Sequence, residues 1–361
     1  MNIFSRYLIR NVFLGFAAAA ALLIPLFTTF NLINELDDVS PAGYHWTQAV
    51  MVVAMTTPRS LIDLAPFIAL LGGIVGMGML SKSLELTAIR TVGFSVFRIG
   101  LVVLVAGVLI TLPLGALDEW VASPLQQRAL QIKNSAMAKD KDNNSPSNVL
   151  WARKGNEFVT VKQLDANQQP QGVEIFTYKP DLSLESYIYA SSARVQKDGT
   201  WLLQGVNQKR WLDRQKKVET VDSLEWHSIF TGMSLEELTM PADSFSIRQL
   251  NHYIGYLDDT GQPSIQYRIA LWQKLGRPIL MLAMILLAIP FTFVAPRSPG
   301  VGSRLAVGVI VGLLTYISYQ IIVNLGLLLS LNVQLATLLP PLLLLAVALW
   351  LVWRFDKKTI A

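Results

Sequence analysis

The side chains that most often do chemistry in enzymes are scarce in this sequence. There is no cysteine, and the three histidines, His45, His227 and His252, lie far apart, so thiol catalysis and a multi-histidine metal site are excluded. His227 could pair with Glu225 as an acid–base couple, but polar residues at the edge of a strand are much commoner than such couples. The motifs G-x-x-x-x-G-K-[S/T], G-x-S-x-G and H-E-x-x-H are absent. The sequence therefore predicts a non-catalytic chain that binds no cofactor and no metal ion.

Three basic residues point instead to anion binding. Lys274 and Arg277 are three residues apart and would share one face of a helix, and Arg268 precedes them. At the end of a membrane helix such cations can bind lipid phosphates, or they can anchor the helix at the interface. The net charge of +5 could also suggest nucleic-acid binding, but the distribution of the basic residues favours a membrane.

The elements that must position these residues are membrane helices. The chain is 52% hydrophobic and only 15% charged, whereas a soluble chain carries about 25% charge. The stretches without any charged residue are Val12–Ile33, Leu64–Leu80, Ile99–Leu117, Pro278–Pro296, Leu305–Leu329 and Val333–Trp353. Because about 20 apolar residues cross the hydrocarbon core, the sequence predicts six transmembrane helices. The second is expected to be one long helix over residues 48–80, kinked at Pro58 and Pro66.

The lysines and arginines outside these spans predict the orientation. They gather before span one, in alternate short loops and after span six: Arg6, Arg10, Lys82, Arg90, Arg98, Arg297, Arg304, Arg354, Lys357 and Lys358. The opposite loops, 34–48 and 330–332, contain no basic residue. Since cytoplasmic loops carry the excess of basic residues, we expect both termini in the cytoplasm and residues 118–269 on the extracytoplasmic side of a multi-pass membrane protein.

Residues 118–269 are long enough for a domain with its own core, and their pattern is mostly β. Lys154-Gly155-Asn156 and Asp198-Gly199 separate apolar runs as hairpin turns do. We expect about seven to nine strands in a sandwich or roll, flanked by helices such as 123–138. The sequence does not divide its aromatic residues between a core and a binding groove: Trp151, Phe158, Phe176, Tyr189 and Trp201.

The predicted organisation thus has three parts. Residues 1–117 hold spans one to three, with a short surface helix at about 81–97 in which Glu85 and Ile89 share a face. Residues 118–269 form the β domain, and residues 270–361 hold spans four to six. The surface helix could insert into a groove on a cytoplasmic partner, or it could be a solvated linker. Gly72-x-x-x-Gly76 predicts close helix packing within the membrane.

Several segments resemble one family. The run Leu80–Gly93, LSKSLELTAIRTVG, is similar to the loop that follows span two in the lipopolysaccharide-export permeases of the LptF/LptG type. Pro66–Gly72 resembles the span before that loop, and Leu150–Val159 favours the LptG branch. The order of three helices, an inserted β domain and three helices is also the family's layout, and the resemblance covers nearly the whole chain.

The resemblance implies a function and partners. It implies a permease subunit of an ABC exporter that extracts lipopolysaccharide from the outer leaflet of the bacterial inner membrane and passes it through a periplasmic β-jellyroll toward the outer membrane. The partners would be an LptF-like subunit in a heterodimer, two copies of a cytoplasmic ATPase that uses the ATP, a single-span LptC-like protein and a periplasmic bridge protein. The alternatives from the residues alone are a membrane-anchored scaffold whose β domain binds a periplasmic partner, and a small solute carrier.

The resemblance also implies site residues. Those expected to couple to the ATPase are Glu85, Leu86, Ile89 and Arg90. Those expected at a lateral gate or cavity are Phe27, Phe30, Asn31, Asn34, Phe67, Tyr316, Tyr319 and Gln320. Related chains often carry lysines for lipid phosphates at the outer end of span one, but here Asn34–Asp38 contains three carboxylates and no cation. We therefore expect the partner subunit, or Arg268, Lys274 and Arg277, to supply the positive charge.

Overall fold

The computed structural model describes residues 3–358, except for 42, 141–149, 166–168, 182, 197–199, 213–214, 229–239, 293–300 and 330–331. The chain forms two compact units. The helical unit comprises Met1–Lys133, Phe245–Leu250 and Ile265–Ala361, and the second unit comprises Asn134–Ser244 and Asn251–Ser264. The helical unit therefore extends past residue 117 to Lys133, because the helix of the third span is continued there by further helix.

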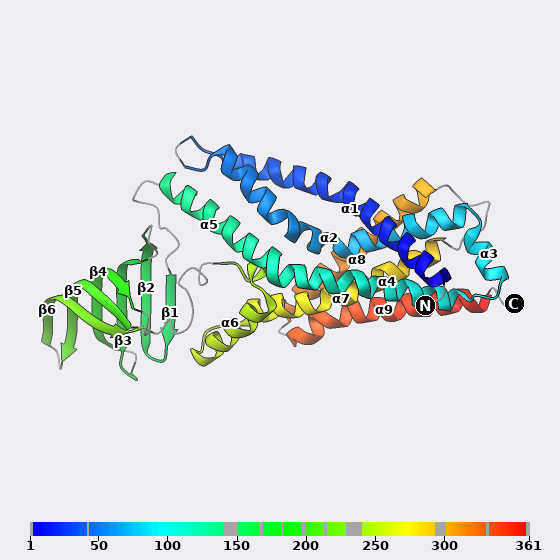
Figure 1. The fold of residues 1–361 in the computed structure, drawn as a ribbon. Coiled ribbons are helices and arrows are strands. Elements are labelled where there is room, and N and C mark those ends of the chain that lie inside the picture. The colour runs from blue at the N-terminus through cyan, green and yellow to red at the C-terminus, as the bar shows by residue number, and fades with distance from the viewer. Residues whose placement is uncertain are drawn as a thin grey trace. The chain divides into compact units, whose positions relative to one another are not determined.

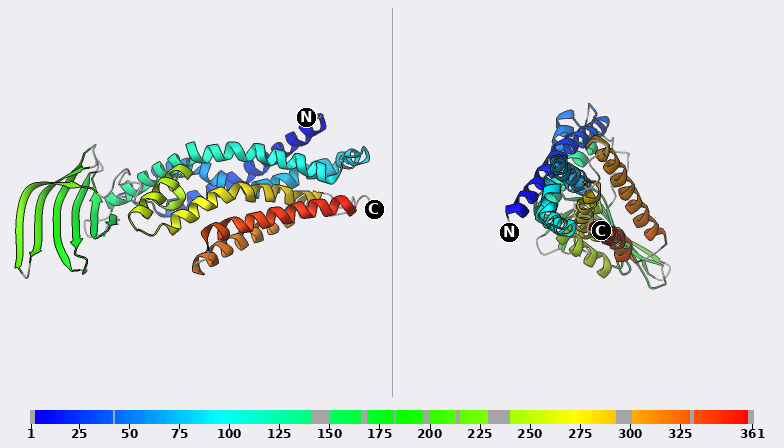
Figure 2. Two further views of the ribbon diagram at one scale, coloured as in Figure 1. Left: turned by 90° about the horizontal axis from the view of Figure 1, so that it is seen from below. Right: turned by 90° about the vertical axis from the view of Figure 1, so that its right-hand side faces the viewer.

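Six helices in the helical unit are long and apolar enough to cross a membrane, as predicted. They are α1 (Ile3–Asp37), α2 (Trp46–Lys82), α4 (Val96–Leu117), α7 (Ile265–Thr292), α8 (Val301–Leu328) and α9 (Val333–Lys358). The short helix α3 (Glu85–Thr91) lies at the same end of the helical unit as both termini (Figures 1 and 2), and we call this the α3 end. The long second span is confirmed, because α2 continues across Pro58 and Pro66.

The third span continues without a break into a polar helix. After α4 the chain makes one π-helical turn at Asp118–Ala122 (η1) and goes on as α5 (Ser123–Asp140). The outward continuation predicted for residues 123–138 is therefore confirmed. A π-turn within an α-helix is uncommon and frequently lies at a functional site. Here it positions Asp118 inside the helical unit, where the residue is buried.

Helices α1 and α2 meet backbone to backbone, as the Gly72-x-x-x-Gly76 pattern predicts. Gly15 of α1 faces Gly72 and Gly76 of α2. A Cβ atom at Gly72 would lie 2.6 Å from the Cα of Phe16, which no real Cβ atom tolerates. The contact therefore requires glycine, and it fixes α1 against α2.

We expect Gly72→Leu to destabilise the helical unit by about 3 kcal/mol, near the upper end of the range for overpacked cores. The control is Gly78→Leu in the same helix, because a Cβ at Gly78 meets no atom within 4 Å. Its effect should stay within about 0.5 kcal/mol. Thermal unfolding of both purified variants in detergent measures the difference, and equal midpoints would show that the α1–α2 contact is not close-packed.

The second unit contains the inserted β domain that the sequence predicts. Its strands are β1 (Leu150–Lys154), β2 (Glu157–Leu164), β3 (Pro170–Tyr178), β4 (Leu184–Val195), β5 (Thr200–Leu212) and β6 (Gln215–His227). Within the described ranges they form one antiparallel sheet in sequential order (Figure 1), rather than seven to nine strands. The hairpin at Lys154-Gly155-Asn156 is confirmed by the β1–β2 pairing, whereas the Asp198-Gly199 turn lies outside the described residues. Helix α6 (Ile247–Asp259) follows the sheet in the chain.

The two faces of the sheet differ in composition. One face is a buried core of Val, Ile, Ala and Leu that includes Trp201, whose ring packs edge-on against Trp226 at 5.4 Å. By the strand register, four other aromatic residues lie on the opposite face: Trp151, Phe158, Phe176 and Tyr189. Cations lie over rings on that face, with Lys162 at 5.6 Å from Tyr189 and Lys209 at 5.5 Å from Tyr187. The structure thus assigns Trp201 to the core and the other four to the second face.

Two glycines let the buried face follow a bend in the sheet. Gly172 in β3 (φ 64°) and Gly205 in β5 (φ 62°) adopt left-handed conformations. Both lie opposite Ser191 of the intervening strand β4, so the three residues form one row across the sheet. Across this row the buried residues are spaced by three instead of two, for example Ala190 to Ala193 in β4. Glycine in a strand interior commonly marks such a bend, and both sides of it contribute to one apolar cluster.

Candidate functional site

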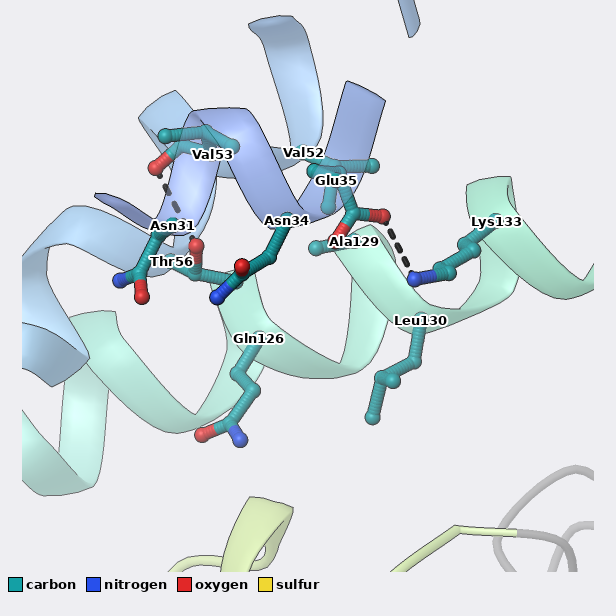
Figure 3. Close-up of a pocket in the computed structure, with 10 residues that line it drawn as sticks. All are labelled: Asn31, Asn34, Glu35, Val52, Val53, Thr56, Gln126, Ala129, Leu130 and Lys133. Carbon is teal, nitrogen blue, oxygen red and sulfur yellow. Dashed lines mark hydrogen bonds and ion pairs between the residues drawn. The ribbon is translucent and has the colours of Figure 1, made fainter. Parts of the chain in front are cut away.

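A cavity of about 220 Å³ opens between α1, α2 and α5, toward the end of the helical unit away from α3 (Figure 3). It is lined by Asn31, Asn34, Glu35, Val52, Val53, Thr56, Gln126, Ala129, Leu130 and Lys133. Two predicted gate residues, Asn31 and Asn34, therefore line one cavity. Asn31 donates a hydrogen bond to the Ser60 hydroxyl at 3.3 Å, while the buried Oε1 of Gln126 accepts none. The lining mixes polar and apolar side chains, as is common for ligand pockets.

Lys133 of α5 supplies the cation that the end of α1 lacks. Its Nζ lies 2.8 Å from Glu35 Oε1 and 2.8 Å from Asp38 Oδ2. The buried Tyr44 hydroxyl donates to the same Glu35 carboxylate at 2.9 Å. Burial, together with this hydrogen bond, raises the pKa of Tyr44, so its hydroxyl remains a protonated donor. The acidic end of α1 is thus tied to α5 by ion pairs.

The sequence analysis did not single out Lys133. Its only available signal was the predicted helix 123–138, which places Lys133 beyond the membrane end of span three. Nothing in the sequence says that this helix packs against the end of span one, because that choice depends on how the helices are rotated against each other. The ion pairs to Glu35 and Asp38 identify Lys133 in the structure.

Lys274, predicted to contact lipid phosphate, lies instead in a buried ion-pair cluster. Its side chain is 2% exposed, and its Nζ lies 2.9 Å from Asp118 Oδ2 and 3.3 Å from Ser123 Oγ. Arg59 Nη1 lies 2.9 Å from the other Asp118 oxygen. The expectation for Lys274 is therefore corrected. Lys274 and Arg277 do share one face of α7, as predicted. That face points toward carboxylates of neighbouring helices.

The other two cations of that prediction differ from Lys274. Arg277 Nη1 lies 3.1 Å from Asp63, a carboxylate that also lies 3.3 Å from Arg59 Nε. The Asp63 side chain is 46% exposed, so this part of the cluster reaches the surface. Arg268 is exposed near the start of α7. Arg277 and Arg268 thus remain closer to the surface than Lys274.

The depth of the cluster follows from helix geometry. Arg59 lies about 35 Å from the α3 end of α2 at 1.5 Å per residue, slightly more than the hydrocarbon thickness of about 30 Å. The cluster Arg59–Asp63–Asp118–Lys274–Arg277, which we call the ion-pair cluster, thus lies about one hydrocarbon thickness away from the α3 end. It joins α2, η1 and α7.

Of the remaining predicted gate residues, those on α2 and α8 form a second group. The rings of Phe67 and Tyr316 are 6.2 Å apart, and Gln320 donates to the Tyr316 hydroxyl at 3.1 Å. Tyr319 is partly buried one turn from Tyr316. On α1, Phe27 and Phe30 are exposed, by 40% and 57%. The ring contact and the hydrogen bond thus join Phe67, Tyr316 and Gln320 to one another. Asn31 of α1 is joined to α2 by its hydrogen bond to Ser60.

The helices that carry these groups leave most of their apolar surface uncovered. Of its most apolar stretch, α2 buries 72% against the rest of the chain, whereas α1 buries 22% and α8 buries 17%. Large exposed apolar surfaces are expected to contact lipid or a partner. The predicted gate helices α1 and α8 therefore have uncovered apolar surface that can contact lipid or a partner.

The predicted coupling residues lie on and around α3. Leu86 is buried and Ile89 packs partly against the core, so these two anchor the helix. Glu85 and Arg90 are partly exposed, and Glu85 accepts hydrogen bonds from Tyr7 and Ser83. The outward face carries Leu84, Ala88 and Val92, of which Val92 is 79% exposed. Arg297, predicted to belong to the same end of the molecule, lies outside the described residues.

Comparison with known proteins agrees with this architecture. Residues 6–354 match the model of the family described as lipopolysaccharide export system permease LptF/LptG. The chain is 27% identical over 357 residues to the lipopolysaccharide export system permease protein LptG of Escherichia coli (strain K12), covering 98% of both chains. It is 26% identical over 355 residues to the LptG protein of Haemophilus influenzae (strain Rd), covering 98% of this chain and 99% of that one. A six-span chain with an inserted antiparallel β domain, matched over almost its whole length, belongs to the LptF/LptG family of lipopolysaccharide export system permeases.

Proposed function

We propose that this chain is the LptG-like permease subunit of an ABC exporter in the bacterial inner membrane. It extracts lipopolysaccharide from the outer leaflet and passes it through its β domain toward the outer membrane. The observation that carries this proposal is the family match over residues 6–354 in a chain without an ATP-binding motif. The energy must then come from a separate ATPase, and no cofactor is needed in this chain itself.

The need for an external motor follows from the substrate. Moving an acyl chain from lipid into water costs about 0.8 kcal/mol per CH₂ group, hence roughly 10 kcal/mol for a chain of about a dozen carbons. Several chains multiply that cost. An exporter must therefore couple an energy source to an apolar path, and the apolar core of the β domain is the candidate for that path outside the membrane.

The α3 end faces the cytoplasm in this proposal. The start of α1, helix α3 and the end of α9 lie at that end (Figure 1). These segments contain Arg6, Arg10, Arg90 and Arg354, which fits the excess of basic residues expected on the cytoplasmic side. Two copies of the ATPase bind there and contact α3, with the exposed Leu84 and Val92 entering an apolar groove. The motion of the ATPase pair narrows the cavity between subunits and drives lipid toward the periplasm.

The uncovered faces of α1 and α8 fit a heterodimer with an LptF-like subunit. Each gate would pair α1 of one subunit with the fifth span of the other, so that Phe27, Phe30 and Tyr316 border lipid entry. A single-span LptC-like protein associates with the pair, and a periplasmic bridge protein receives the lipid. This arrangement is supported by the low buried fraction of α1 and α8 in the single chain, because it leaves their surfaces open to a second subunit.

The headgroup is proposed to meet Lys133. A lipid phosphate carries the same type of charge as Glu35 and Asp38 and can replace them as the partner of the ammonium. Arg268 and Arg277 are the next cations on this side of the ion-pair cluster, together with those of the LptF-like subunit. Lys274 is left out, because Asp118 already neutralises it inside the helical unit.

The experiment that tests this function is purification of the unmodified protein from its native membrane. We expect a stoichiometric ATPase, an LptF-like subunit and bound lipopolysaccharide, and ATP-dependent release of that lipid from reconstituted vesicles. A periplasmic partner without ATPase or glycolipid would support the scaffold alternative instead. A copurified small solute would support a solute carrier.

A further inference from the structure

The carboxylate of Glu85 is held by two hydrogen bonds from different parts of the chain. Tyr7 of α1 donates its hydroxyl to Oε2 at 2.7 Å, and Ser83 donates its hydroxyl to Oε1 at 2.9 Å. The Tyr7 bond has the short length of a hydrogen bond to an ionised acceptor, and the Ser83 bond has an ordinary length. Because a carboxylate offers about four lone-pair sites, each oxygen can still accept a bond from a partner protein. The side chain is thus oriented but not blocked.

The backbone at this point does not by itself fix Glu85. Leu84, which precedes it, has φ 61°, and it is the one non-glycine residue with positive φ in the described part of the chain. A left-handed leucine is unfavourable, so this conformation persists only where surrounding contacts impose it. The bonds from Tyr7 and Ser83 are such contacts, because they hold the residue that follows the turn.

Helix α1 holds α3 at both ends. Phe4, three residues before Tyr7 and on the same face of α1, packs its ring 4.7 Å from that of Phe94, just after α3. Between these contacts, Leu8 of α1 and Leu86 of α3 are both buried in the same apolar cluster. A displacement of α3 therefore acts on α1 directly, as well as through α2.

We propose that Tyr7 is a positioning residue for lipid export: its hydroxyl orients the Glu85 carboxylate toward the ATPase and joins that contact to α1. This inference rests on the proposed function, in which α3 meets the ATPase and α1 borders the gate. Tyr7 then makes α1 follow α3 when the ATPase closes. The phenol ring alone does not suffice, because the hydroxyl provides the bond.

The test is Tyr7→Phe in the complete exporter, which removes one oxygen and keeps the ring. We expect the permease heterodimer to assemble in the membrane as the wild type does, and export is measured per ATP hydrolysed by the ATPase that is bound. The lipid released per ATP should fall about tenfold, the order expected for losing a hydrogen bond to an ionised group. The control is Thr337→Val in α9, which also loses a hydroxyl, but one that donates within its own helix, to the Val333 and Gln334 carbonyls.

A second variant separates an effect through Glu85 from a general effect on folding. In a Glu85→Ala background no side-chain acceptor is left for the Tyr7 hydroxyl, so adding Tyr7→Phe should change the lipid released per ATP by less than about twofold. An unchanged export ratio in Tyr7→Phe alone would overturn the inference, as would a tenfold loss that persists in the Glu85→Ala background. If the wild-type complex itself holds no ATPase or releases no lipid, the proposed function fails instead, which is a different result.

Discussion

Replacing Asp118 with leucine is expected to destabilise the helical unit by about 3–5 kcal/mol, the cost of removing one partner from a buried ion pair. The Asp118 carboxylate lies between Lys274 and Arg59. Its Oδ1 is 2.9 Å from Arg59 Nη1, and its Oδ2 is 2.9 Å from Lys274 Nζ. Without it, the Lys274 ammonium remains in an environment where its side chain is 2% exposed. Arg59 retains only Asp63, at 3.3 Å. The buried positive charge is then uncompensated.

The measurement is thermal unfolding of the purified variant in detergent, with two companions. Asp63→Asn should cost less than about 1 kcal/mol, because Asp63 is 46% exposed and water replaces it. Asp118→Leu combined with Lys274→Met should recover part of the loss, since removing both charges of a buried pair is often nearly neutral. A wild-type melting curve for Asp118→Leu would mean that the ion-pair cluster does not hold α2, η1 and α7 together.

Exchanging Glu85 for lysine is expected to reduce the ATPase that copurifies with the permease at least about tenfold, while membrane insertion stays intact. The substitution inverts the charge at the start of α3 and removes the acceptor of the Tyr7 and Ser83 bonds. An arginine or lysine of the ATPase that pairs with Glu85 would then face a like charge, which disfavours the complex by several kcal/mol. Export should fail for lack of a motor.

Quantitative mass spectrometry of the affinity-purified complex measures this effect. Glu185→Lys provides the matched control, because it makes the same charge change at an exposed position on β4 of the β domain. We expect the control to keep its full complement of ATPase. Normal ATPase recovery with Glu85→Lys would remove Glu85 from the coupling surface and with it the proposed role of α3.

The helices could be predicted because their signal is local. A run of uncharged apolar residues long enough to cross the bilayer has few alternatives to a membrane helix, and all six such runs became one. A short helix within about residues 81–97 and the hairpin at Gly155 were likewise predicted from neighbouring residues; both are present, although the helix is shorter, Glu85–Thr91. The family resemblance also depended on contiguous runs such as Leu80–Gly93, which the family match over residues 6–354 bears out.

The partners of the charged side chains could not be predicted, and Lys274 shows why. Its spacing from Arg277 gave the correct shared face, but the direction of that face depends on the rotation of α7 against α2 and η1. The carboxylates that neutralise the pair, Asp118 and Asp63, are far away in the chain. The same holds for Lys133, whose partners Glu35 and Asp38 lie on α1.

In the β domain, too, local features could be predicted from the sequence and long-range features could not. Alternation identified the strands, but the left-handed Gly172 and Gly205 change the spacing of buried residues from two to three in β3, β4 and β5, so the faces of the aromatic residues in these strands could not be read from the chain. The sequence by itself determined which segments cross the membrane, where the β domain is inserted and which family the chain resembles, because apolar length and contiguous motifs are properties of neighbouring residues. Only the tertiary structure decided which cations are neutralised, which aromatic residues form the core and that Tyr7 holds Glu85. These outcomes depend on how the helices are rotated and the strands bent against each other. The same pattern of apolar and polar residues along the chain is compatible with many different sets of tertiary contacts.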